Sequence, residues 1–217
     1  MPQSNFIPRR RRSRGVNSVL HIFCEGATEE AYFEAYKRKN HCVAVVIEHS
    51  HHGDPKGLVE EAIKAKAGSP TNDIFWVVYD AEDLSQRNKL QAHAEAFQAA
   101  KRNGINIAFS AICFEVWLLL HFTPNPSAFL QPSKAVKELQ KYIKNYKKGD
   151  LNILTTLQDK LSAARVNAAR LAQRQYRNTP EAPMYEHNPY TTVHLLLDAI
   201  DGMSKWKFMD RIFSEKV

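Results

Sequence analysis

The most regular pattern in the chain is a series of short, mostly apolar runs, each followed by a stretch with helical spacing. A run of five or six such residues is typical of a strand buried on both faces of a sheet. The predicted strands cover residues 19–23, 43–47, 74–79 and 105–109, and the predicted helices after the first three cover residues 28–39, 57–67 and 86–103. This alternation predicts an α/β fold with a mostly parallel four-stranded sheet and flanking helices.

The rest of the chain has a helical pattern. Pro132 suits the first turn of a helix that runs to about residue 146, and apolar positions from Leu154 to Leu171 mark a second helix. Two short helices are predicted near residues 190–200 and 205–213. We therefore expect a basic tail over residues 1–17, an α/β core over 18–125 and a C-terminal helical extension, packed on that core, over 126–217.

The chain has 217 residues and a net charge of +7, and the tail supplies most of that charge through Arg9, Arg10, Arg11, Arg12 and Arg14. With two prolines and little that could pack, residues 1–17 are predicted to be disordered. They could hold nucleic-acid phosphates or an acidic protein, or only increase solubility. The helical extension carries lysines between residues 134 and 148 and arginines between residues 165 and 177. These side chains form either solvated helix faces or a surface that binds nucleic acid.

Other classes of protein are disfavoured by the sequence. The longest apolar run is shorter than a transmembrane helix requires, and the basic N-terminus lacks the apolar segment of a signal peptide. Cys24, Cys42 and Cys113 lie in apolar runs without metal-ligand spacing. They are expected to be buried free thiols in a reducing cytoplasm.

Carboxylates follow two of the predicted strands. Asp80, Glu82 and Asp83 come directly after the run at 74–79, and Glu25 follows the first run and precedes Gly26. Ligands of open α/β sheets bind outside the carboxyl ends of the strands. Clustered carboxylates repel one another, and their oxygens suit Mg²⁺ or Mn²⁺. The alternative is a solvated, acidic start to the next helix.

Glu115 is the only charged residue in the apolar stretch SAICFEVWLLLHF. A carboxylate in such surroundings costs free energy unless it is paired or bound. Glu115 is therefore either a site carboxylate, one half of a structural ion pair, or a charge on the exposed edge of a short helix.

Four stretches, FCEGATEEAYF (23–33), VVYDAED (77–83), SAICFEVWLLLHF (110–122) and NPYTTVHLLL (188–197), are similar to the RloB-like family. This family has a Toprim-type fold and is found beside restriction and anti-phage loci. The resemblance implies a Toprim-like core and a Mg²⁺-dependent nuclease of DNA or RNA. It further implies an antiviral effector of the abortive-infection kind, alongside a partner ATPase or as a homo-oligomer, with no membrane partner.

The resemblance also implies roles for individual acids. Glu25 would be a metal ligand or a base, and Asp80 and Glu82 would be metal ligands. Asp83 would be a further ligand or supporting acid, and Glu115 a supporting acid. The family's D-x-D pair reads Asp80-Ala81-Glu82 here, and the longer arm of glutamate changes the geometry of the pair.

Two functions remain open on these residues. The first is a metal-dependent nuclease, and the second is a catalytically silent module that binds phosphate or nucleic acid and regulates an ATPase. A receiver-type signalling domain is a third candidate, but it needs an acidic pair after the first strand, where this sequence has only Glu25.

Overall fold

The computed structural model describes residues 18–50, 52–82, 84–150 and 152–214, with side chains as far as Met203. The predicted disorder of residues 1–17, the arginines from Arg9 to Arg14, and Asp83 all lie outside the described residues.

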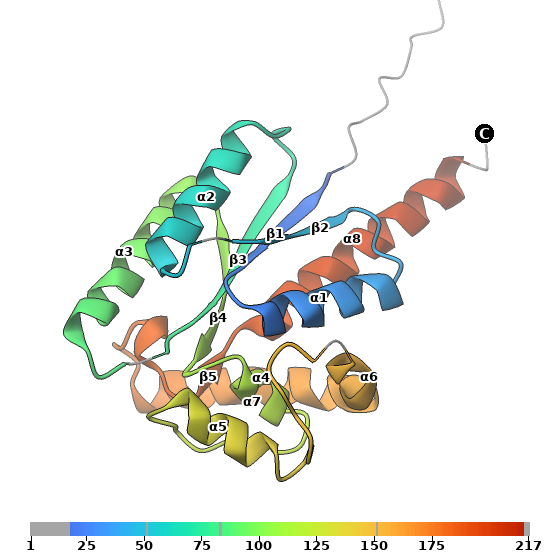
Figure 1. The fold of residues 1–217 in the computed structure, drawn as a ribbon. Coiled ribbons are helices and arrows are strands. Elements are labelled where there is room, and N and C mark those ends of the chain that lie inside the picture. The colour runs from blue at the N-terminus through green and yellow to red at the C-terminus, as the bar shows by residue number, and fades with distance from the viewer. Residues whose placement is uncertain (1–17, 51, 83, 151, 215–217) are drawn as a thin grey trace, which may run out of the picture.

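The centre of the molecule is a five-stranded, mostly parallel sheet (Figure 1). Its strands are β1 (Leu20–Cys24), β2 (Val45–His49), β3 (Ile74–Asp80), β4 (Asn106–Ala111) and β5 (Tyr190–Thr191), in the order β2-β1-β3-β4-β5. The four parallel strands agree with the apolar runs of the sequence. The prediction of only four strands is wrong, because β5 adds an antiparallel edge to β4 and is too short to leave a pattern.

The strand order reverses direction between β1 and β3. From β1 the chain passes through α1 (Ala27–Lys39) to β2 on one side, and then returns through α2 (Pro55–Ala67) to β3 on the other side. The carboxyl ends of β1 and β3 are neighbours, since Cys24 pairs with Val78 in parallel register. Such a switch point leaves a crevice between the diverging connections, which is where open α/β sheets bind ligands.

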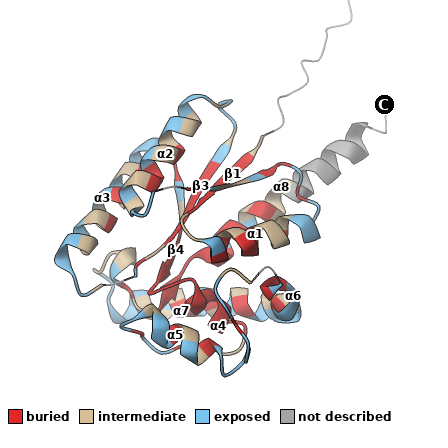
Figure 2. Ribbon diagram, viewed as in Figure 1, coloured by how far each residue is buried: buried red, intermediate tan, exposed pale blue. Residues whose placement is uncertain are grey.

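Helices cover both faces of the sheet (Figures 1 and 2). On β3, Phe75, Val77 and Tyr79 pack into a cluster with α2 and α3 (Arg87–Asn103), whereas Trp76 and Val78 pack into the larger cluster on the opposite face. The larger cluster contains buried side chains of α1 and α8 (Val193–Ser214). The alternation follows from the two-residue period of a strand and explains why the run at 74–79 is apolar at every position.

The remaining helices join the larger cluster. They are α4 (Glu115–Leu119), α5 (Pro132–Leu139), α6 (Ile153–Leu157) and α7 (Leu161–Asn178), with short 3-10 turns at Gln158–Lys160 and Met184–Glu186. In Figure 1 they lie together below the sheet, near the carboxyl ends of β1, β3 and β4. This placement brings the C-terminal half of the chain to the carboxyl edge of the sheet, where the acidic residues lie at the ends of the strands.

Three helix predictions need correction. α5 ends at Leu139 rather than near residue 146, because residues 141–149 form turns that are anchored on Glu115 and Thr28. The predicted helix from Leu154 is divided by the turn at Gln158–Lys160. The two predicted C-terminal helices are one, α8, which passes through Gly202.

The sequence predicts no transmembrane helix and three buried free thiols, and the structure bears on both predictions. No helix in the described part of the chain is both long enough and apolar enough to cross a membrane. Cys24, Cys42 and Cys113 are buried thiols that form no disulfide bond among the described residues, as predicted.

Gly104, which follows α3, adopts the left-handed conformation of a C-cap, with φ of 63°.

Candidate functional site

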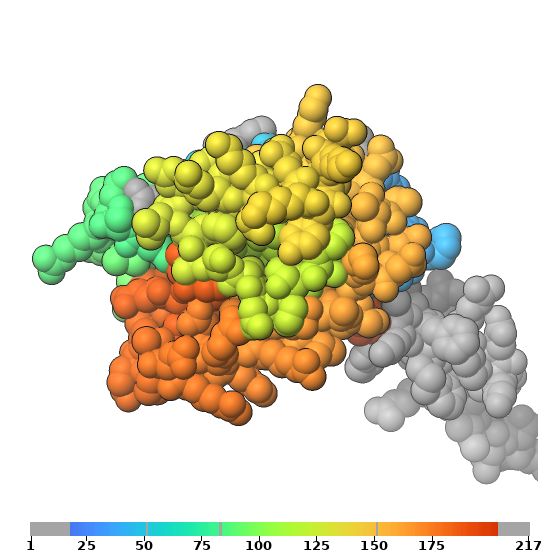
Figure 3. All heavy atoms as spheres, turned by 90° about the horizontal axis from the view of Figure 1, so that it is seen from below, coloured from blue at the N-terminus to red at the C-terminus, as the bar shows by residue number. Residues whose placement is uncertain are grey.

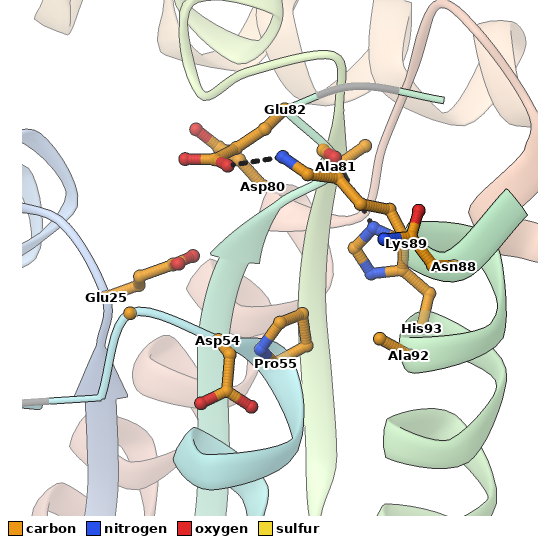
Figure 4. Close-up of a pocket in the computed structure, with 11 residues that line it drawn as sticks. Glu25, Asp54, Pro55, Asp80, Ala81, Glu82, Asn88, Lys89, Ala92 and His93 are labelled. Atoms are coloured by element: carbon orange, nitrogen blue, oxygen red, sulfur yellow. Dashed lines mark hydrogen bonds and ion pairs between the residues drawn. The ribbon is translucent and has the colours of Figure 1, made fainter. Parts of the chain in front are cut away.

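The carboxyl ends of β1 and β3 bring Glu25 and Asp80 to the same cavity (Figure 4). Asp80 is the last residue of β3, and Glu25 directly follows β1. The backbone amide of Glu25 donates a hydrogen bond of 3.1 Å to the Val78 carbonyl, which continues the β1–β3 ladder by one residue. The sheet itself therefore fixes the backbones of both acids.

Two adjoining hollows share Glu25, Gly53, Asp80 and Glu82. The first, of about 200 Å³, is further lined by Asp54, Lys89 and His93 among others. The second, of about 440 Å³, extends to residues of α1, α4 and the loop after α5, namely Thr28, Glu29, Glu115, Lys148 and Gly149. We call the two hollows together the acidic cavity.

Glu82 reaches the cavity from a strained turn. Its φ is 56°, in the left-handed region that residues other than glycine adopt infrequently. Its backbone amide donates a hydrogen bond of 2.9 Å to the Ile112 carbonyl. Its side chain is 62% exposed and forms an ion pair of 3.1 Å with Lys89, drawn as a dashed line in Figure 4. Glu82 is thus the solvent-facing acid of the group.

Glu115 is buried rather than placed on an exposed helix edge, so that interpretation of the sequence is excluded. The residue is 1% exposed at the start of α4. Its Oε1 accepts a hydrogen bond of 2.9 Å from the Tyr146 hydroxyl, whereas its Oε2 has no hydrogen-bond partner among the described residues. Glu115 lines the larger hollow of the acidic cavity together with Glu25 and Asp80.

Glu29 is a fifth carboxylate, and the sequence reasoning missed it. It lies in the first turn of α1, is 5% exposed, and lines the cavity. Its Oε2 lies so close to Gly26 that a Cβ atom at residue 26 would displace it. The signal was available, because Glu29 precedes Tyr32 by three residues and Phe33 by four and so belongs to the buried stripe of the helix.

Burial and mutual repulsion make these acids hard to ionise. Burial, followed by the charge of Glu82, raises the pKa of Glu25 to about 7, although a backbone hydrogen bond at Asp80 acts in the opposite direction. Burial, with the charge of Glu115, raises the pKa of Glu29 to about 7. Burial, followed by the charges of Glu29 and Glu115, raises the pKa of Asp80 well above its ordinary value.

A lysine partly offsets the negative charge. Burial alone would lower the pKa of Lys148, but the charges of Glu115 and Asp80 outweigh that effect and raise it. The loop that carries Lys148 is fixed at its end, because the Gly149 amide donates a hydrogen bond of 2.9 Å to the Thr28 hydroxyl. The helical extension therefore supplies one wall of the cavity and one of its positive charges.

Asp54 and His93 complete the smaller hollow, and neither was predicted. Asp54 is the N-cap of α2, where Oδ1 accepts a hydrogen bond of 2.9 Å from the Gly57 amide. His93, on α3, is buried and stacks on Tyr79 with a centroid distance of 5.8 Å and an interplanar angle of 2°. Burial lowers the pKa of His93, which favours the neutral form of the ring.

The residues present suit a divalent cation in their chemistry. Asp80 is half-buried, but its Oδ1 is shielded from solvent and, like Glu115 Oε2, has no hydrogen-bond partner in the described structure. Among the described residues, no three His, Cys, Asp or Glu side chains stand close enough together to hold a metal ion. Mg²⁺ does not require three protein ligands, because it commonly binds one or two carboxylates and keeps several waters.

Comparisons with known proteins agree with the sequence resemblance. A family model described as RloB-like protein matches residues 20–200. No curated protein matches the chain, and no solved structure matches it.

Proposed function

The chain belongs to the RloB-like family, and we propose that it is a Mg²⁺-dependent nuclease with a Toprim-type core. The observation that carries this proposal is the convergence of Glu25, Asp80 and Glu82 on one cavity at the switch point of the sheet. Metal-assisted phosphodiester hydrolysis uses carboxylates that hold a divalent cation at an accessible position, and the carboxylates that line this cavity support such a role.

Asp80 and Glu82 would hold the cation together with several waters, and Glu25 would lie beside them in the same cavity. The bound cation, Mg²⁺ or Mn²⁺, would neutralise charge on the scissile phosphate and polarise it. Asp80 would contribute a buried oxygen without a hydrogen-bond partner among the described residues, and Glu82 would contribute an exposed carboxylate.

Glu25 is suited to move a proton. A general base works best when its pKa lies near the pH at which the enzyme operates. Burial and the charge of Glu82 raise the pKa of Glu25 to about 7, so both protonation states are populated near neutral pH. We assign Glu25 as the residue that accepts a proton from the attacking water when it is not bound to the cation.

A second function is favoured by one specific observation. Lys89 already forms an ion pair of 3.1 Å with Glu82. Lys148 lines the cavity, and the charges of Glu115 and Asp80 raise its pKa. Two cations of the chain beside the acids would let the cavity bind a phosphate group without turnover. The alternative is therefore a regulatory module that binds phosphate or nucleic acid, in the same setting.

The setting is proposed from the family resemblance. The protein would act in the cytoplasm as an effector of phage defence, with a partner ATPase or as a homo-oligomer. The arginines from Arg9 to Arg14 would add sequence-independent contacts to nucleic-acid phosphates.

The proposal is tested by incubating the purified chain with end-labelled DNA and RNA, each single- and double-stranded, in Mg²⁺, Mn²⁺ or EDTA. We expect cleavage of at least one substrate with either cation, none with EDTA, and a loss of at least a hundredfold in Asp80→Asn. Asp159→Asn, an exposed aspartate outside the cavity, is the matched control and should cleave as the wild type does. Binding of these substrates without cleavage in either Mg²⁺ or Mn²⁺ would support the silent module instead.

A further inference from the structure

We propose that Phe122 and Tyr142, together with the lysines between residues 134 and 148, form a docking surface for single-stranded nucleic acid that leads into the acidic cavity. The proposal names a single strand as the substrate class of the proposed nuclease, and this substrate assignment rests on the proposed function. The docking surface itself is argued from contacts and charges that are independent of catalysis.

The first observation is a pair of stacked aromatic rings, in which Phe122 is partly buried and Tyr142 is exposed. Phe122 follows α4, and its ring stacks on that of Tyr142 with a centroid distance of 4.8 Å and an interplanar angle of 16°. Tyr142 remains 45% exposed. The ammonium group of Lys160 lies 5.7 Å from the centroid of the Phe122 ring. Exposed aromatic faces beside cationic groups are the elements with which proteins bind the bases and phosphates of single strands.

The second observation is the concentration of charge in the segment that carries Tyr142. Residues 131–149 contain six lysines and one glutamate, a net charge of +5, whereas the whole chain carries +7. Glu138 pairs with Lys141 at 2.7 Å, which leaves the other lysines of the segment to interact with a ligand. All six are exposed: Lys134, Lys137, Lys141, Lys144, Lys147 and Lys148.

The third observation is the connection between this surface and the cavity. Glu115, in the cavity, is the first residue of α4, and Phe122, in the aromatic pair, lies in the turn that directly follows this short helix. The segment after α5 spans the same interval, since Tyr142 stacks on Phe122 and Tyr146 bonds to Glu115. In Figure 3 the yellow atoms of this segment and the yellow-green atoms near α4 lie together on one face of the molecule.

These observations favour a single strand over a duplex. Stacking on an aromatic side chain requires a base whose face is free, and the base faces of a duplex are already covered by their neighbours. A strand with one base on Tyr142 and its backbone along Lys144 and Lys147 would reach the cavity beside Lys148. That lysine is the one whose charge is already held by the acids of the cavity.

The test measures binding without cleavage, by fluorescence anisotropy in EDTA at two salt concentrations. The probes are labelled dT20, its RNA equivalent U20, and a 20-base-pair duplex. Tyr142→Ala should weaken binding of at least one single strand about 5- to 100-fold, and Tyr142→Phe should retain the wild-type affinity. The double variant Lys144→Ala/Lys147→Ala should lower the salt slope for the strand by about 1.4.

The matched control is Lys64→Ala/Lys101→Ala, which removes two exposed lysines of α2 and α3. It should bind as the wild type does. If Tyr142→Ala binds both strands as Tyr142→Phe does, or the two lysine pairs behave alike, the docking surface is wrong even if the protein cleaves nucleic acid. If the wild type binds through Tyr142 but cleaves nothing in Mg²⁺ or Mn²⁺, the surface stands and the nuclease function fails.

Discussion

The hydroxyl group of Tyr146 donates a hydrogen bond of 2.9 Å to Oε1 of Glu115, and this bond joins the loop after α5 to the acidic cavity. It leaves Glu115 Oε2 buried without a hydrogen-bond partner among the described residues. A carboxylate that is held on one side and open on the other keeps a fixed orientation toward the cavity.

Tyr146→Phe should lower the free energy of unfolding by about 1–3 kcal/mol, because it leaves a buried carboxylate oxygen without its donor. Urea denaturation measures the change. Tyr142→Phe, which removes a hydroxyl from a half-exposed ring, is the control and should be neutral. Equal stability of both variants would show that the bond does not hold the loop.

Substitutions of Glu115 should separate its charge from its hydrogen bond. Glu115→Gln keeps an acceptor for Tyr146 and removes a charge that repels Glu29 and Asp80. The metal-free protein should therefore be at least as stable as the wild type. Glu115→Leu deprives the Tyr146 hydroxyl of its acceptor and should impair folding or activity. A Leu variant with native melting temperature and full activity would contradict any role for this residue.

The contribution of Glu25 to the stability of the metal-free protein should fall as pH rises from about 4.5 to about 7. The pKa of Glu25 is raised from 4.5 to about 7, so in that interval this group binds more protons in the folded state than in the unfolded state. Its contribution to the free energy of unfolding therefore decreases as the proton dissociates. Glu25→Gln should flatten this part of the curve, whereas Glu60→Gln, at an exposed position, should not. Melting temperatures in EDTA from pH 4 to pH 8 provide the measurement, and parallel curves for all three proteins would contradict the raised pKa.

A variant that begins at Val16 should bind nucleic acid more weakly and with a smaller dependence on salt. It lacks the five arginines that supply most of the net charge, and each lost phosphate contact lowers the salt slope by about 0.7–0.9. Anisotropy titrations at two salt concentrations measure both quantities. An unchanged affinity and slope would assign the tail to solubility.

The parallel strands and the two strand-end acids could be predicted because each depends on local sequence. The run at 74–79 is apolar at every position since both faces of β3 are covered, and Glu25 and Asp80 are placed by their position at strand ends. The strand Tyr190–Thr191 could not be predicted, because two residues have no periodicity and their pairing with Ser110 and Ala111 is set by tertiary packing.

The remaining features of the site depend on contacts between distant segments. Lys148 enters the cavity only because Tyr146 and Gly149 bond to residues 31 and 121 positions away. α8 continues through Gly202, at a cost of about 0.5–1 kcal/mol relative to alanine, since its first half is anchored by buried Leu196, Leu197 and Ile200. Local propensity favoured a break there, and packing prevailed.

The most direct test of a cation site at Asp80 is the melting temperature of the wild type and of Asp80→Asn, each in EDTA and in excess Mg²⁺ or Mn²⁺. The wild type should be stabilised by the cation, by about 2.7 kcal/mol at a hundredfold excess over its dissociation constant. Asp80→Asn removes a repelled charge at nearly constant shape, so without metal it should be as stable as the wild type or more so, and it should show no shift with the cation. A wild type that ignores both cations, together with an Asp80→Asn variant that loses about 1–3 kcal/mol, would contradict the cation site and identify Asp80 as a structural carboxylate.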